Sequence, residues 1–119
     1  ELIAELNQRD GINATLHGGF GRKPKVLSAA NQKLFELAKE CGEDLGMSIN
    51  WVATGGCCDG NNLAAAGIPN IDTLGVQGGK IHSSDEYMFV SSLSERARLS
   101  ALLLMKLASA ADLSWLKEQ

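Results

Sequence analysis

His82 is the residue of this sequence best suited to metal or proton chemistry. It lies in residues 78–87, a polar segment that opens with two glycines and holds two serines, an aspartate and a glutamate. Neutral imidazole is the commonest metal ligand in proteins and the usual proton shuttle near neutral pH. Taken alone, a histidine in such a segment is better explained as an exposed loop residue. Its role therefore depends on the residues and elements around it.

A second candidate segment, residues 54–62, has the sequence Thr-Gly-Gly-Cys-Cys-Asp-Gly-Asn-Asn. Glycines let a backbone approach a ligand closely, and successive amide groups can form a concave site for an anion. Asp59 is placed to cap a helix beginning near Gly60 or to orient a neighbouring group. The alternative is a tight strand-to-helix turn with Asp59 as its cap, and the sequence does not separate the two.

The spacing of apolar residues predicts the elements that position these segments. Helical spacing predicts helices at residues 2–10, 28–45, 63–66 and 92–110. Strands are predicted at residues 12–16, 49–53 and 70–74. This alternation favours an open α/β sheet, in which ligands bind at the carboxyl ends of the strands. We therefore expect residues 55–62 and 78–86 to lie on the same rim of the sheet.

Charge and composition exclude several classes of partner. The net charge is −3 and the pI about 5.3, which argues against nucleic acid and anionic membranes as partners. No apolar run reaches the roughly 18 residues needed to span a bilayer. Three cysteines, two of them adjacent, do not resemble a disulfide framework, so reduced thiols in the cytoplasm are expected.

Several short motifs together resemble the C-terminal signature of one zinc exopeptidase family. They are Thr54-Gly55-Gly56 with Asp59, then Ala66-Gly67-Ile68-Pro69, then Gly78-Gly79, and finally His82 with Glu86-Tyr87. The family includes bacterial glutamate carboxypeptidase, aminoacylase, acetylornithine deacetylase and succinyl-diaminopimelate desuccinylase. The resemblance extends from about Gly11 to Ala108 and is much more specific than a lone Gly-Gly-x-x-Asp.

The resemblance implies a fold and a domain organisation. In the family, a catalytic domain that holds two metal ions is interrupted by a smaller lid domain, which also mediates dimerisation. Residues 1–20 resemble the last helix and strand of the lid. Residues 21–119 resemble the C-terminal segment of the catalytic domain, an open mixed sheet with flanking helices. The chain is thus expected to be a C-terminal fragment of a homodimeric enzyme.

The resemblance also implies roles for individual residues. His82 matches a histidine that binds one of the two metals, which are zinc or else cobalt or manganese. Arg22 resembles the arginine that holds the substrate carboxylate, and a guanidinium suits this task because it can bond both carboxylate oxygens. The segment lining the substrate pocket matches Gly55, Gly56, Cys57, Cys58 and Asp59. The implied substrate is a peptide or N-acyl amino acid, cleaved next to its free carboxylate by a metal-activated water.

The sequence departs from the family pattern in three respects. Cys57 and Cys58 stand where the family usually has Gly followed by Ser or Thr, and a thiol is the weaker hydrogen-bond donor, so substrate preference is expected to differ. Lys23 separates Arg22 from Pro24, which affects the placement of the arginine. The family's His-x-Asp motif, bridging carboxylate and Glu-Glu pair have no counterpart here.

These missing groups limit what the chain can do alone. The other histidine, His17, falls on the expected lid strand and is predicted to be a surface residue. Because a catalytic zinc typically needs three protein ligands, we expect the isolated chain to be inactive and to bind no zinc tightly. A cut sheet also exposes strand edges, so self-association is expected.

Two other functions stay open. Cys58, just before a predicted helix, would act as the nucleophile of a thiol hydrolase with His82 as its base. Alternatively, the chain is a non-catalytic dimerising module or a degenerate family member.

Overall fold

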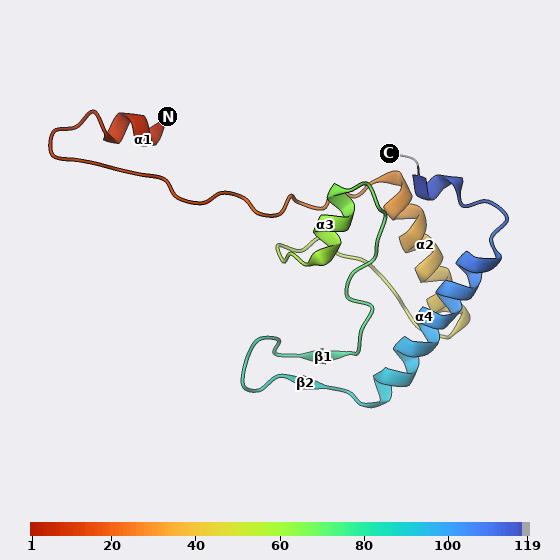
Figure 1. Ribbon diagram of the computed structural model, residues 1–119. Coiled ribbons are helices and arrows are strands. Elements are labelled where there is room, and N and C mark those ends of the chain that lie inside the picture. The colour runs from red at the N-terminus through yellow and green to blue at the C-terminus, as the bar shows by residue number, and fades with distance from the viewer. Residues whose placement is uncertain (118–119) are drawn as a thin grey trace.

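Two long helices packed side by side form the body of the structure (Figure 1), a computed structural model that describes residues 1–117. Helix α2 (Ala29–Asp44) contributes Ala38 and Cys41 to the core, and α4 (Ser91–Ser109) contributes Leu99 and Leu103. A short 3-10 helix, η1 (Ser114–Lys117), returns the chain to the side of α2. These contacts bury part of the apolar stripes that predicted the two helices, while Leu93 and Leu104 of α4 stay exposed.

The start of α2 confirms the predicted N-cap. Ser28 has an extended backbone, and its Oγ accepts a hydrogen bond from the backbone N–H of Asn31 at 3.1 Å. The helix ends at a Leu45 cap, followed by Gly46 at a φ of +72°. A positive φ is a conformation that glycine adopts without steric cost, so the end also falls where the sequence predicts it.

Two shorter helices stand at other points along the chain. Helix α1 (Leu2–Leu6) lies at the N-terminus and is shorter than predicted. Helix α3 (Asp59–Ala65) begins directly after the glycine-rich segment 54–58 and ends before Gly67, which has a φ of +78°. It begins four residues before the apolar run that predicted it.

The strands differ most from the prediction. The described residues contain one sheet, an antiparallel pair formed by β1 (Gly78–Gly79) and β2 (Tyr87–Met88), with Gly78 opposite Met88 and Gly79 opposite Tyr87. The segments 12–16, 49–53 and 70–74 are not strands in this structure. A strand exists only where a neighbouring strand takes up its backbone hydrogen bonds, and within residues 1–117 no strand pairs with these segments. The α/β class is confirmed in this coarse form, and the predicted open sheet is absent from residues 1–117.

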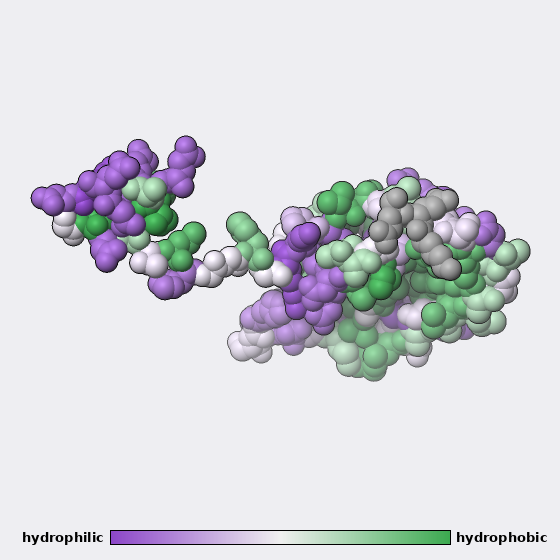
Figure 2. Space-filling view, turned by 45° about the horizontal axis from the view of Figure 1, so that its top comes forward, coloured by the Kyte–Doolittle hydropathy of each residue, from purple (hydrophilic) through white to green (hydrophobic). Residues whose placement is uncertain are grey.

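The molecule is extended rather than compact. Its radius of gyration is 20.6 Å and its principal extents are 67 × 42 × 17 Å, whereas a compact domain of this length has a radius of about 13–14 Å. Residues 1–20 leave the body as an arm, seen at the left of Figure 1 and Figure 2. Apolar side chains are exposed on the arm and the body alike, among them Leu16, Phe20, Val52 and Leu104. No helix within residues 1–117 has the length and apolarity to cross a bilayer.

Candidate functional site

His82 lies in the loop that joins β1 to β2. The loop is held by its own polar groups: Ser83 Oγ donates to the Lys80 carbonyl at 2.7 Å, and Lys80 Nζ pairs with Asp85 Oδ2 at 3.3 Å. The backbone N–H of His82 donates to Glu86 Oε2 at 3.3 Å. His82 itself has a φ of +65°, which is uncommon for a residue with a side chain. The loop therefore holds an exposed histidine in a conformation that functional sites often contain.

The hairpin that carries this loop requires glycine at position 78, because a Cβ there would overlap the backbone carbonyl oxygen of Tyr87. At Gly79 an added Cβ would lie 2.8 Å from the Tyr87 hydroxyl and would displace that side chain. Farther along, Ser92 of α4 accepts from the Gln77 N–H at 2.9 Å and donates to the Phe89 carbonyl at 2.6 Å. Ser92 is buried, so it fastens both strands of the hairpin to the first turn of α4.

The loop that contains residues 55–58 leads into α3, and Cys58 is the N-cap of that helix. The Cys58 N–H donates to Asn61 Oδ1 at 3.0 Å, and the Asn61 N–H donates to the Cys58 carbonyl at 3.1 Å. The prediction that Asp59 caps this helix is wrong, because Asp59 is already the first helical residue. The Asp59 carboxylate takes no part in the cap and bonds a different residue.

The partner of Asp59 is Arg22. Arg22 Nη2 donates to Asp59 Oδ1 at 2.9 Å across 37 positions of sequence, and the two side chains are 39% and 89% exposed. Two residues that the sequence assigned to substrate binding are thus in direct contact. The other option for Asp59, that it orients a neighbouring group, agrees with this pair.

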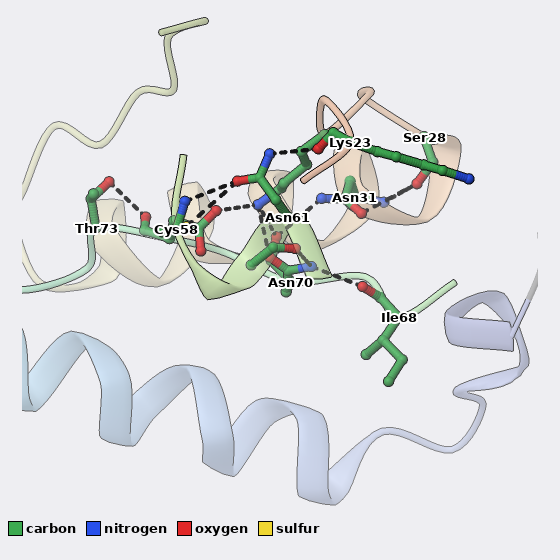
Figure 3. A network of polar contacts seen from close by, with 11 residues as sticks. Lys23, Ser28, Asn31, Cys58, Asn61, Ile68, Asn70 and Thr73 are labelled. Atoms are coloured by element: carbon green, nitrogen blue, oxygen red, sulfur yellow. Dashed lines mark hydrogen bonds and ion pairs between the residues drawn. The ribbon is translucent and has the colours of Figure 1, made fainter. Parts of the chain in front are cut away.

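A network of polar contacts joins the segments that carry this pair (Figure 3); Asn31 and Asn61 are buried in it, and Lys25, Asn70 and Asp72 are half-buried. Asn61, which is 9% exposed, donates from Nδ2 to the Lys23 carbonyl at 3.0 Å and so joins the segment after Arg22 to the cap of α3. Asn70 donates to the Gly60 carbonyl at 3.1 Å, and Asn31 of α2 donates to the Asn70 carbonyl at 3.0 Å. Three segments distant in sequence are therefore held together by side-chain amides.

Lys25 supplies the charge in this network. Its Nζ donates to Asn70 Oδ1 at 2.8 Å, to the Asn70 carbonyl at 3.0 Å and to Asp72 Oδ2 at 2.6 Å. The hydrogen bond from Lys25 lowers the pKa of Asp72, and a hydrogen bond from the Cys58 thiol acts in the same direction. The side chains of Lys25 and Asp72 are only 16% and 30% exposed, so this ion pair is the better shielded one near the site.

Gly60 is the residue of α3 that lies against Asp72, the partner of Lys25. A Cβ at this position would overlap Asp72 Oδ1 and would lie 2.6 Å from both Asp72 Oδ2 and Asn70 Oδ1. Only a residue without a side chain lets the first turn of α3 approach these oxygens so closely.

The sequence interpretation did not identify the network residues, which are Lys25, Asn31, Asn61, Asn70 and Asp72. One signal was available: Asn70 and Asp72 stand on either side of apolar Ile71, in a segment that also holds Thr73 and Leu74. Polar side chains next to a residue that packs on the core need hydrogen-bond partners of their own. The identity of those partners depends on long-range contacts that spacing does not reveal.

The structure does not bring all the predicted site residues together. The loop bearing His82 and helix α3 lie in separate parts of the fold (Figure 1), and within residues 1–117 no hydrogen bond joins His82 to Arg22 or to residues 55–59. Gly55, Gly56 and Cys57 are exposed, beside the half-buried Cys58. The expectation of a shared rim is therefore wrong for this structure, because it assumed neighbouring strands of an open sheet that do not form within residues 1–117. Cys58 likewise makes no hydrogen bond to His82 here, so the thiol-hydrolase alternative gains no support.

A complete metal site is also not formed by the described residues. No group of three or more His, Cys, Asp or Glu side chains in residues 1–117 is arranged to hold a metal ion. His82 offers one imidazole, whereas a catalytic zinc typically takes three protein ligands. The side chains present here thus do not fit a whole metal centre.

Comparison with known proteins supports the assignment drawn from the motifs. The model of peptidase family M20/M25/M40 matches residues 12–106, nearly the same span as the resemblance seen in the sequence. No curated protein and no solved structure matched the chain. The family match covers α2, α3, most of α4 and the hairpin that carries His82, together with Arg22 and residues 55–59. Over this span, which is most of its length, the chain belongs to peptidase family M20/M25/M40, a family of metal-dependent hydrolases.

Proposed function

We propose that residues 21–119 are the C-terminal segment of the catalytic domain of a di-zinc metallohydrolase, and that residues 1–20 end its lid. The enzyme would cleave a peptide or N-acyl amide bond next to a free carboxylate. Family membership supports the hydrolase class. The one structural observation that supports the free carboxylate is that the Arg22 guanidinium already bonds a carboxylate at 2.9 Å.

In this proposal each part of the chain has a binding task. Arg22 holds the substrate carboxylate, with residues 55–59 beside it as the pocket wall. His82 is one ligand of a metal centre, with zinc, cobalt or manganese as the ion. The other ligands and the general base lie outside these 119 residues, and the chain alone is inactive.

The proposal includes assembly and compartment. The exposed apolar side chains of the arm and the body favour self-association, and we propose a homodimer. Three free cysteines, one of them buried in the core, are consistent with a reducing cytoplasm.

A chimera tests this function. Residues 21–119 would replace the matching segment of an active family member, and hydrolysis of N-acetyl amino acids and dipeptides would be measured. We expect turnover in the chimera, loss of turnover in His82→Ala, and a raised KM in Arg22→Lys, which keeps the charge but not the guanidinium fork. A chimera carrying residues 1–119 would add a matched control, since His17→Ala removes the other histidine and should leave turnover unchanged. A folded chimera whose turnover survives His82→Ala would refute the proposed role of His82.

A further inference from the structure

We infer that Asp59 is a specificity-determining residue that occupies Arg22 until the carboxylate of a ligand displaces it. The inference rests on the proposed role of Arg22 as the group that binds the substrate carboxylate. It adds that the site holds its own carboxylate competitor, so that a ligand without a carboxylate cannot take the arginine.

Asp59 binds Arg22 through a direct hydrogen bond. Asp59 Oδ1 sits 2.9 Å from Arg22 Nη2, which is the distance of a charge-assisted hydrogen bond. The aspartate carboxylate has the same chemistry as the end of the proposed substrate. It therefore occupies Nη2 of the guanidinium, one of the donors that a substrate carboxylate would use, and the two anions compete.

The backbone on both sides of the Arg22–Asp59 pair is held in place by Asn61. Buried Asn61 bonds the Lys23 carbonyl and the Cys58 N–H, which are the neighbours of Arg22 and Asp59 in sequence. The two side chains of the pair are themselves exposed. The fold thus fixes where the pair forms, while either side chain can turn away without disturbing a packed core.

The ion pair between Arg22 and Asp59 is weak because both side chains are exposed. Exposed ion pairs contribute so little that releasing Asp59 should reduce apparent carboxylate affinity only by about two- to fivefold. An uncharged ligand offers nothing to compensate the lost ion pair, and so it leaves the arginine with Asp59. The competition is therefore small enough to be reversible and large enough to measure.

The test is a titration of the complete 119-residue chain with N-acetylglycine, followed by NMR through the Arg22 side-chain Nε–H signal. N-acetylglycinamide is the uncharged control ligand. We expect Asp59→Asn to bind N-acetylglycine about two- to fivefold more tightly than the wild type. Arg22→Gln, followed through the backbone signals of residues 55–59, should abolish binding, and the amide should not bind. Asp10→Asn makes the same change in net charge on the arm and should leave the affinity unchanged.

The outcomes separate this inference from the proposed function. Equal or weaker affinity in Asp59→Asn, with binding still lost in Arg22→Gln, would overturn the role of Asp59 and leave that of Arg22 standing. If Asp10→Asn raised the affinity for N-acetylglycine as much as Asp59→Asn does, the effect would be one of net charge, and the inference would be overturned. Binding that survives Arg22→Gln, or no binding by the wild type and Asp59→Asn, would overturn the assignment of Arg22 and the inference with it.

Discussion

Replacing Gly60 by alanine should destabilise the chain, although the same change in a helix normally stabilises it. Gly60 is the second residue of α3, and alanine is favoured over glycine by about 0.5–1 kcal/mol inside helices. Here the added methyl group would overlap the Asp72 carboxylate and come within 2.6 Å of Asn70 Oδ1. Both groups are fixed by Lys25, so neither can yield without losing a hydrogen bond.

The expected loss of stability in Gly60→Ala follows from the hydrogen bond between Lys25 and Asp72 that the added methyl group would disturb. Moving the Asp72 carboxylate weakens a charge-assisted bond of 2.6 Å between partly buried groups, and such bonds contribute about 1.5–3 kcal/mol. This loss exceeds the gain in helix propensity. We therefore predict a net loss of about 1–2 kcal/mol in the free energy of unfolding.

Urea unfolding followed by circular dichroism would measure the change. Gly55→Ala is the matched control, because nothing lies within 4 Å of its added Cβ and its stability should hardly change. In an Asp72→Ala background the cost of Gly60→Ala should shrink, since the main clash is gone. Stabilisation by Gly60→Ala, or an equal cost in both backgrounds, would refute this account of α3 and its network.

Three further predictions concern the network and the core. Because the Lys25 ammonium lowers the pKa of Asp72, the pair stabilises the fold above the unfolded aspartate pKa of about 3.9, and this stabilisation is lost as pH falls through the lower folded pKa. Urea midpoints should therefore fall below about pH 4 in the wild type, and the Asp72→Asn variant should lose this part of the pH dependence. Leu99→Ala should lower the free energy of unfolding by about 2–5 kcal/mol in the same urea assay, because Leu99 of α4 is 0% exposed in the core shared with α2. A loss under about 1 kcal/mol would contradict the core described here. Burial raises the pKa of the Cys41 thiol, so iodoacetamide at pH 8 should alkylate exposed Cys57 first and Cys41 only on unfolding, as peptide mass analysis would report.

The helices could be predicted because their signals are local. Ser28 lies directly before the run of apolar residues at helical spacing that becomes α2, and α4 carries an apolar stripe broad enough to define its length. The two helices bury part of these stripes against each other, through Ala38 and Cys41 of α2 and Leu99 and Leu103 of α4, so propensity and packing agree there.

The strands could not be predicted in the same way because a strand depends on its partner. Residues 49–53 have a suitable composition, yet Trp51 and Val52 are exposed and no strand within residues 1–117 pairs with this segment. The hairpin of β1 and β2 was missed for the opposite reason. Its strands are two residues long, and Gly78 and Gly79 resemble loop residues until the packing of Tyr87 against them is known.

The candidate site was predictable in type and only partly in geometry. The motifs placed Arg22 and Asp59 in one functional region, and the structure joins them by a hydrogen bond. The network around Lys25 and Asn70 was not foreseen, because its contacts cross 45 positions of sequence. His82 remains apart from this region, because the strands assumed to bring the two loops together are not formed within residues 1–117.

We propose that this chain supplies one ligand of a metal site, His82, and cannot complete that site alone. A calorimetric titration of the purified 119-residue chain with zinc chloride tests this. We expect weak or undetectable binding, and any weak binding should fall in His82→Ala but not in His17→Ala. Tight binding of two zinc ions per chain, lost in His82→Ala and retained in His17→Ala, would contradict it.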